Sequence, residues 1–455
     1  MPSSEIFFEK NIFKAITIYS IPVLLSLFLQ ALYGAVDLWA VGQFSHFYDI
    51  SAVAIASEFM MIVTQFISGF LTATTVLLSS KVGSGDKNAE RNVTIASVIL
   101  FTIIGVIFSI VITAFAPFFA DLMNTPSESK SGAIAYLRIS GAGTLFIVYY
   151  NLISAIFRAL GDSKSPFIFV SIAAVVNIIG DVVLTHFLHM GTSGVAIATI
   201  SSQAISVIVS YFYLRRVLKS NENNKADEHE KKSLMYKELV KIGLPLGLQA
   251  SITELSYAIV ISFGNTFGVV ASSGIGVATK IIMFIYLIPV AFTQTTSVFT
   301  SSNCGKGDTE RAKKCLWMAT LIATVLGFIA AVVLFFFGDK LSLLFTSEAQ
   351  VIAASHDYLK VCAVECFLLS FVYCLLGYFN GIGRTKFVVI VSLLPIFLVK
   401  IPYAYYAAFI ANPSVANIAV ADALSSILQF IMTLCYYFAV RTKKIPILLD
   451  ENSKR

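Results

Sequence analysis

The chain has 455 residues, of which 57% are hydrophobic and only 13% are charged, and its mean hydropathy is +0.83. An ordinary soluble domain carries about 25% charged residues, so this composition excludes a soluble globular protein and indicates a polytopic membrane protein. The net charge of +6 is not gathered on a folded soluble surface, so we predict no nucleic-acid partner.

Apolar runs of about 20 residues or more, the length needed to cross a bilayer, recur along the whole chain. They predict an all-α polytopic membrane protein with twelve transmembrane helices. The polar lead before the first run has no clear cleavage site, so we expect that first helix to be retained. The helices are predicted at residues 15–40, 51–76, 93–118, 132–157, 166–188, 191–214, 238–264, 272–300, 315–337, 357–380, 387–410 and 415–440.

Basic residues are distributed unevenly among the connecting segments. Lys and Arg concentrate at both ends of the chain and in every second connection, whereas the alternate connections hold only Lys130 and Lys340. Cytoplasmic loops carry this excess of basic residues. The sequence therefore predicts a multi-pass protein of the cell membrane with both termini in the cytoplasm.

The second half of the chain repeats the first. Tyr136 and Gly161 recur as Tyr358 and Gly383, and the turn around Asp86 recurs around Asp308, each 222 residues later. Six helices per half give both halves the same orientation, so a parallel internal repeat of two six-helix bundles is expected. The predicted domains are an N-terminal bundle (1–214), a cytoplasmic linker (215–237), a C-terminal bundle (238–440) and a cytoplasmic tail (441–455).

Prolines lie inside several predicted helices. Pro22 in the first helix and Pro245 in the seventh are nearly one repeat apart. Proline removes a backbone hydrogen bond and kinks a helix. Pro22 is therefore a candidate for a bend that changes during transport, and the alternative is a static kink.

Acidic residues inside spans are costly and indicate function. Asn177 and Asp181 are four residues apart, so they share one helical face, and Asp37 lies at a comparable depth in the first helix. Two carboxylates and an amide can bind a hard cation through oxygen or can share a proton, and Asn151 and Thr199 could add oxygens. The alternative is that each acid bonds locally to backbone or hydroxyl groups.

Other polar residues of the spans suggest secondary roles. Glu254 is the candidate for a second coupling residue in the C-terminal half, whereas Glu58, Glu365 and Asp422 could cap or line the outer mouth. Lys400 or Lys280 could pair with a neighbouring acid, the usual state of a membrane lysine. Substrate-cavity residues are expected among polar and aromatic side chains that attract organic cations, namely Gln30, Tyr33, Tyr149 and Tyr257.

The sequence carries no set of catalytic motifs: it has no P-loop, no nucleotide-binding glycine fingerprint and no HExxH. We therefore predict no enzyme activity and no cofactor. Without a nucleotide site, uphill transport would depend on a transported Na⁺ or H⁺.

Four segments together resemble the multidrug and toxic compound extrusion (MATE) family, in its DinF-like branch. They are IPVLLSLFLQALYGAVDLWAVG, IFRALGDSKSPF, VNIIGDVVLTHFLHMGTSGVAIATISSQ and KIGLPLGLQ. The resemblance implies two six-helix bundles, alternating access and cation-coupled export. It also implies ion-coupling roles for Asp37, Asn177 and Asp181, fits Asn151 and Thr199, and places the bend of the first helix at Pro22.

We therefore expect a secondary active antiporter, working as a monomer, that exports drug-like amphipathic compounds, often cationic, in exchange for a monovalent cation. The main alternative is a flippase for a lipid-linked precursor from the same superfamily. A membrane-embedded transferase is a weaker alternative, because the sequence shows no cluster of His, Asp and Arg at a membrane face.

Overall fold

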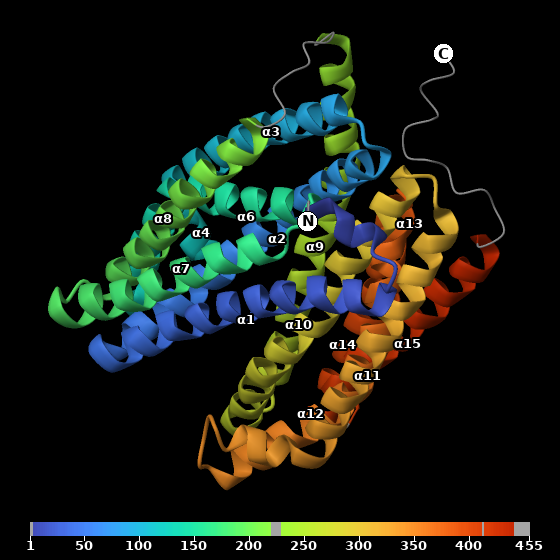
Figure 1. Ribbon diagram of the computed structural model, residues 1–455. Coiled ribbons are helices and arrows are strands. Elements are labelled where there is room, and N and C mark those ends of the chain that lie inside the picture. The colour runs from blue at the N-terminus through green and yellow to red at the C-terminus, as the bar shows by residue number, and fades with distance from the viewer. Residues whose placement is uncertain (1–2, 220–228, 412–413, 441–455) are drawn as a thin grey trace. The chain divides into compact units, whose positions relative to one another are not determined.

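The computed structural model describes residues 3–219, 229–411 and 414–440, which are helical almost throughout (Figure 1). The elements in chain order are η1 (Ser3–Phe8), α1 (Ile12–Phe44), α2 (Phe47–Ser84), α3 (Lys87–Ala114), α4 (Ala116–Leu122), α5 (Ser127–Ala142), α6 (Thr144–Ala159), α7 (Lys164–Val182), η2 (Val183–Phe187), α8 (Gly191–Lys219), α9 (His229–Asn265), α10 (Val269–Gly305), α11 (Thr309–Ser342), α12 (Ala349–Gly381), α13 (Thr385–Pro395), η3 (Ile396–Lys400), α14 (Ile401–Phe409) and α15 (Val415–Val440). The prediction of an all-α fold is confirmed.

The number of membrane spans matches the prediction. Within the described ranges, eleven helical segments are long and apolar enough to cross a membrane, and α5 with α6 form a twelfth candidate that bends by 52°. The bend falls at Gly143, the residue between the two helices. The predicted twelve spans therefore include one that is broken in the middle.

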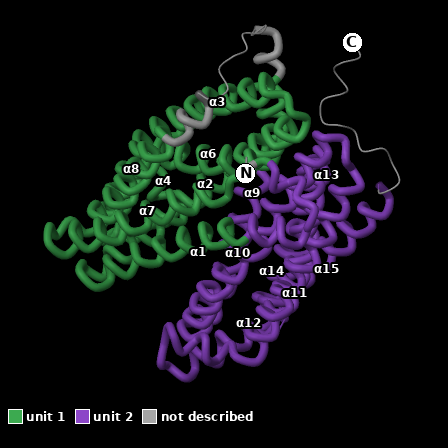
Figure 2. The backbone as a smooth tube through the Cα atoms, in the orientation of Figure 1, with its two compact units in different colours: residues 1–4, 21–247 green, residues 5–20, 248–455 purple. Residues whose placement is uncertain are grey.

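The chain divides into two compact units (Figure 2). Unit 1 comprises Met1–Ser4 and Ile21–Gly247, and unit 2 comprises Glu5–Ser20 and Leu248–Arg455. The domain limits predicted from the sequence, 1–214 and 238–440, remain predictions. The predicted linker, 215–237, lies partly outside the described residues, and the predicted tail, 441–455, lies wholly outside them.

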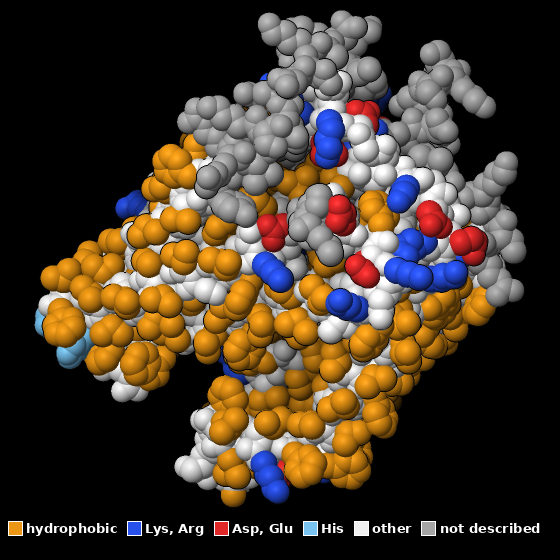
Figure 3. Space-filling view, in the orientation of Figure 1, with side chains coloured by type: hydrophobic (Ala, Val, Ile, Leu, Met, Phe, Trp, Pro, Cys, Tyr) orange, Lys and Arg blue, Asp and Glu red, His pale blue; other side chains and the backbone are white. Residues whose placement is uncertain are grey.

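The flanks of the helices in each unit are apolar. Large hydrophobic side chains such as Ile110, Phe212 and Phe336 are more than 60% exposed. In the face shown in Figure 3, hydrophobic side chains cover the helix flanks, and most charged side chains gather near helix ends. A soluble monomer rarely exposes so much contiguous apolar surface, so these flanks are suited to contact with lipid.

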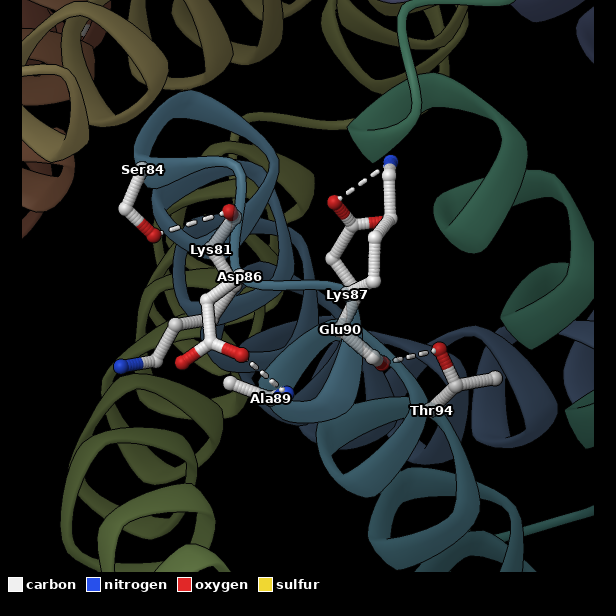
Figure 4. Close-up of polar contacts among 7 residues, drawn as sticks. All are labelled: Lys81, Ser84, Asp86, Lys87, Ala89, Glu90 and Thr94. Carbon is white, nitrogen blue, oxygen red and sulfur yellow. Dashed lines mark hydrogen bonds and ion pairs between the residues drawn. The ribbon is translucent and has the colours of Figure 1, made fainter. Parts of the chain in front are cut away.

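The turn between α2 and α3 shows how the repeat is built (Figure 4). Gly85 adopts a left-handed conformation with φ of 73°, and the Asp86 side chain caps α3 by accepting a 2.9 Å hydrogen bond from the Ala89 amide. Lys87 pairs with Glu90 at 2.8 Å in the first turn of α3. The carboxylate of Asp86, at the N-cap, satisfies an amide that the helix leaves without a partner.

The same device recurs one repeat later. Gly307 has φ of 85°, and Asp308 caps α11 by accepting a 2.9 Å hydrogen bond from the Arg311 amide. Gly161 and Gly383 also share the left-handed conformation, with φ of 89° and 77°. The internal repeat predicted from the sequence therefore extends to backbone geometry.

Three features of the spanning helices affect the polar residues. α1 continues without a break past Pro22, where Ser26 Oγ donates to the carbonyl oxygen of Pro22 at 2.7 Å. α7 ends in a π-helical turn, η2, and α13 passes into α14 through a second π-helical turn, η3, which follows Pro395. A π-helical turn inserts one residue into a helix and is frequent at functional sites.

Candidate cation-binding site

Four polar residues predicted from the sequence meet in unit 1. Asp37 comes from α1, Asn177 and Asp181 from α7, and Thr199 from α8. The Thr199 hydroxyl donates to Asp37 Oδ2 at 3.2 Å and accepts a hydrogen bond from Asn177 Nδ2 at 3.3 Å. The carboxyls of Asp37 and Asp181 adjoin one another. Three helices thus contribute to one cluster of oxygen atoms, the carboxylate cluster.

Local packing explains this meeting. Asn177 and Asp181 are four residues apart and lie on the buried face of α7. Gly180 lets α8 approach closely, because a Cβ at that position would lie only 3.0 Å from Ala198 Cβ. Ala198 precedes Thr199 in the chain, so the close approach brings the hydroxyl of Thr199 beside Asn177.

The carboxylate cluster is buried and lacks enough hydrogen-bond donors. Asn177 and Asp181 are fully buried, and Asp37 is 6% exposed. Four oxygens have no hydrogen-bond partner among the described residues: Asp37 Oδ1, Asn177 Oδ1 and both carboxylate oxygens of Asp181. Buried polar groups are nearly always satisfied, and a buried charge needs a counter-charge or a proton.

The donor set defines what could satisfy these oxygens. Two carboxylates, an amide and a hydroxyl provide oxygen alone, the ligand type that hard cations prefer. A proton shared between the two carboxyls would also relieve their repulsion. No group of three or more His, Cys, Asp or Glu side chains suited to a metal occurs in the described residues. The donor set of the cluster fits a hard cation or a proton.

The other predicted residues of unit 1 lie at different distances from this cluster. Asn151 donates through Nδ2 to the carbonyl oxygen of Ile147 at 2.8 Å, in its own helix. The Tyr149 hydroxyl bonds the Thr102 hydroxyl at 2.6 Å. Tyr33 lies beside Asp37, within one turn of α1. The coupling role of Asn151 and the cavity roles of Tyr33 and Tyr149 remain predictions.

Two buried residues near the carboxylate cluster, Tyr136 and Gln203, had not been proposed as site residues from the sequence. Tyr136 on α5 is buried and lies within electrostatic range of both Asp37 and Asp181. Tyr150 and Gln203 are also buried and lie beside Gln30 and Tyr33, respectively. For Tyr136 the signal was available, because the tyrosine is retained in the second copy as Tyr358.

The predicted residues of unit 2 lie near a buried ion pair. Lys400 Nζ is 2.8 Å from Asp422 Oδ1, and both side chains are 3% exposed. The prediction that Lys400 or Lys280 pairs with an acid is confirmed for Lys400, whereas Lys280 is exposed. Tyr257 presents its ring to Lys400 Nζ, 3.1 Å from the ring centroid. Glu254 lies one turn before Tyr257 in α9, and its role in coupling remains a prediction.

A polytopic helical protein with two repeated units and a buried carboxylate cluster has the features of a secondary transporter. The comparisons agree that the protein is a transporter. A family model described as MatE matches residues 22–183 and again residues 245–406. The chain belongs to this family, the MATE transporters, and is therefore a multi-pass membrane transporter rather than an enzyme.

Curated relatives match along nearly their whole length. The chain is 26% identical over 411 residues to the probable multidrug resistance protein YpnP of Bacillus subtilis (strain 168), covering 90% of this chain and 92% of that protein. It is 22% identical over 388 residues to the multidrug export protein MepA of Staphylococcus haemolyticus (strain JCSC1435), covering 85% of each.

The fold is also similar to a solved structure, described as the outward-facing conformation of a multidrug resistance MATE family transporter of the MOP superfamily. The TM-score is 0.89 at 21% identity, covering 96% of this chain and 98% of that chain. At this identity the likeness shows the fold alone.

Proposed function

We propose that this protein is a secondary active antiporter that exports amphipathic, often cationic organic compounds in exchange for Na⁺ or H⁺. The observation that carries the proposal is the carboxylate cluster of unit 1, with its four buried oxygens that lack a hydrogen-bond partner in the described residues. The names of the relatives, which include multidrug resistance and multidrug export proteins, support the substrate class.

Coupling requires that ion and substrate differ in their affinity for the two states of the transporter. A cation at the carboxylate cluster neutralises the repulsion between Asp37 and Asp181. When the cation leaves, the two adjoining carboxylates attract a cationic substrate or a new proton. Cation and substrate therefore compete for the same negative charge, which is the requirement for exchange.

The test is efflux of a fluorescent organic cation from vesicles, with the Na⁺ and pH gradients imposed separately. Asp37→Asn and Asp181→Asn should each abolish gradient-driven efflux while the protein remains in the membrane. Asp357→Asn is a matched control, because Asp357 is exposed and pairs only at the surface with Lys360, 3.6 Å away.

The two gradients distinguish the ions. Efflux driven by Na⁺ and lost in Asp37→Asn would assign a sodium site, and efflux driven only by the pH gradient would assign a proton site. Normal efflux by both cluster variants would refute the proposal. We further propose that both termini face the cytoplasm and that the protein works as a monomer, to be tested by labelling single cysteines in the loops and by the mass of the purified protein.

A further inference from the structure

Unit 2 contains a second buried polar cluster. Lys400 and Asp422 form its ion pair, and the Tyr358 hydroxyl donates to Asp422 Oδ2 at 3.3 Å. Glu365, 3% exposed, accepts a 3.5 Å hydrogen bond from Ser426 Oγ. We call Lys400, Asp422, Glu365, Tyr257 and Tyr358 the lysine cluster.

The buried faces of the repeated helices show how the two clusters correspond. In the helices that carry them, buried positions of the first copy recur 223 residues later. The pairs are Ile16 and Leu239, Tyr19 and Ile242, Val23 and Leu246, Val195 and Ile418, Ala196 and Ala419, and Ala198 and Ala421. The two ranges that the family model matches are offset by the same number, since residues 22–183 are followed by residues 245–406.

Within the helix that carries Lys400, the π-helical turn η3 accounts for a change of offset from 222 to 223. Just ahead of η3, buried Ala173 corresponds to buried Pro395, at an offset of 222. The extra residue of η3 then shifts the second copy by one position. Asn177 consequently corresponds to Lys400, and both are buried.

At an offset of 223, two side chains that are in contact in the first copy have counterparts that are in contact in the second, but with different chemistry. Asn177 and Thr199 are joined at 3.3 Å in the first copy, and their counterparts Lys400 and Asp422 are joined at 2.8 Å in the second. The two acids of the first copy lose their charge, because Asp37 corresponds to Val260 and Asp181 to Ala404, both buried and apolar.

The two copies therefore balance charge in different ways. In the first, Asp37 and Asp181 adjoin, and no Lys or Arg of the described residues pairs with either within the 4.0 Å limit of an ion pair. In the second, an ammonium is supplied by the chain itself. That ammonium has the environment in which proteins recognise organic cations, because a carboxylate and an aromatic ring both lie beside it.

We propose that Lys400 is a tethered cation that fills, in the second repeat, the position equivalent to the exchangeable-cation site of the first. Unit 2 thus contains a site for a monovalent cation of the alkylammonium class, already occupied by the chain. Exchange of cations is confined to unit 1. The inference rests on the proposed function only for the role of the first repeat.

Removing the ammonium should expose this site. Truncating one partner of a buried ion pair leaves an uncompensated charge and is strongly destabilising. Lys400→Ala would leave Asp422 and Glu365 buried without a cation, and would leave a space of the size of n-propylammonium, the part of the lysine side chain that is removed. The site should then bind that ion from solution.

The experiment measures the melting temperature of the purified, detergent-solubilised protein in the Asp37→Asn/Asp181→Asn background, which removes the cation site of unit 1. Lys400→Ala should melt at a lower temperature, and n-propylammonium should restore it saturably at constant ionic strength. Tetramethylammonium, which cannot donate a hydrogen bond to Asp422, should restore it less. Lys280→Ala is the matched control, because Lys280 is an exposed lysine in a span of the same unit, and it should not respond.

A response of Lys400→Ala no larger than that of Lys280→Ala would overturn the proposal. If Lys400→Ala does not fold, Lys400→Met keeps an unbranched side chain one atom shorter than lysine and removes the ammonium. Its melting temperature should rise with Na⁺ concentration, and a Lys400→Met protein as stable as its parent and indifferent to cations would also refute the tethered cation. Because the unit 1 cluster is disabled throughout, failure of the proposed antiport leaves this result unchanged.

Discussion

Replacing Gly274 with alanine tests the packing that holds the lysine cluster together. Gly274 is buried on α10 and faces α12, where a Cβ would lie 2.6 Å from Ala354 Cβ and 3.0 Å from the Ser355 amide nitrogen. One turn along α12 from Ala354 lies Tyr358, which donates to Asp422. Any separation of α10 from α12 at this point therefore acts directly on the lysine cluster.

The size of the effect follows from the distances. Ordinary contact with a Cβ begins at 3.4 Å, so α12 must move by about 0.8 Å to accept the methyl group, since real cores tolerate little overlap. Overpacking of this kind costs about 1–3 kcal/mol. A gain of about 1 kcal/mol in helix propensity opposes that cost.

Gly276, two residues further along α10, isolates the packing cost. A Cβ there meets nothing within 4 Å, so Gly276→Ala receives the propensity gain without the clash. The free energy of unfolding of Gly274→Ala should therefore be lower than that of Gly276→Ala by about 1–3 kcal/mol. This difference corresponds to roughly 2–4 °C in melting temperature for each kcal/mol in a unit of this size.

Buried cysteines provide the assay. Cys362 and Cys366 are free and buried on α12, so a maleimide dye reports their exposure as the protein is heated. Cys435 is exposed and is replaced with serine in all variants. Equal melting temperatures for Gly274→Ala and Gly276→Ala would refute the reasoning, because the close approach of α10 and α12 would then not resist a methyl group.

Two further predictions concern the repeated polar contacts. Thr199→Val should raise the half-saturating cation concentration of efflux about tenfold, because Asp37 and Asn177 both lose their orienting partner and one hydrogen bond to a charged group is worth about 1.5–3 kcal/mol. Thr199→Ser keeps the hydroxyl and should stay near wild type. Equal half-saturating concentrations for the two variants would contradict this role of Thr199. Asp308→Ala should lower the free energy of unfolding by about 1 kcal/mol through loss of the α11 cap, whereas Asp308→Asn should lower it less. If both variants are as stable as the wild type in thermal unfolding, the cap is dispensable.

Much of the fold was predictable from the sequence because each feature has a local cause. Apolar runs of span length set the helices, and the glycines and capping acids of the turns repeat with the chain. The bend at Gly143 and the π-helical turns could not be predicted. Both depend on how a helix packs against its neighbours, which leaves no fixed pattern in the residues.

The candidate site was predictable to the same degree. The spacing of Asn177 and Asp181 places both on one face of a helix whatever surrounds it, so their proximity followed from the sequence. The contact of Thr199 with Asp37 depends on the approach of three helices. Tyr136 was missed because a tyrosine in an aromatic-rich membrane protein is usually interfacial or part of the packing.

The position of a π-helical turn determines which residues of a repeated helix face the protein interior. In unit 1 the turn follows Asp181, so Asn177 and Asp181 share the buried face with the spacing of a regular helix. In unit 2 the turn lies earlier and ends at Lys400, which brings this residue onto the buried face four residues before Ala404. At an offset of 222 throughout, Val399 would take the place of Asn177, and a buried valine could not neutralise Asp422. The shifted turn and the lysine therefore depend on each other, because burial of this ammonium is stabilising only where the turn aligns it with Asp422.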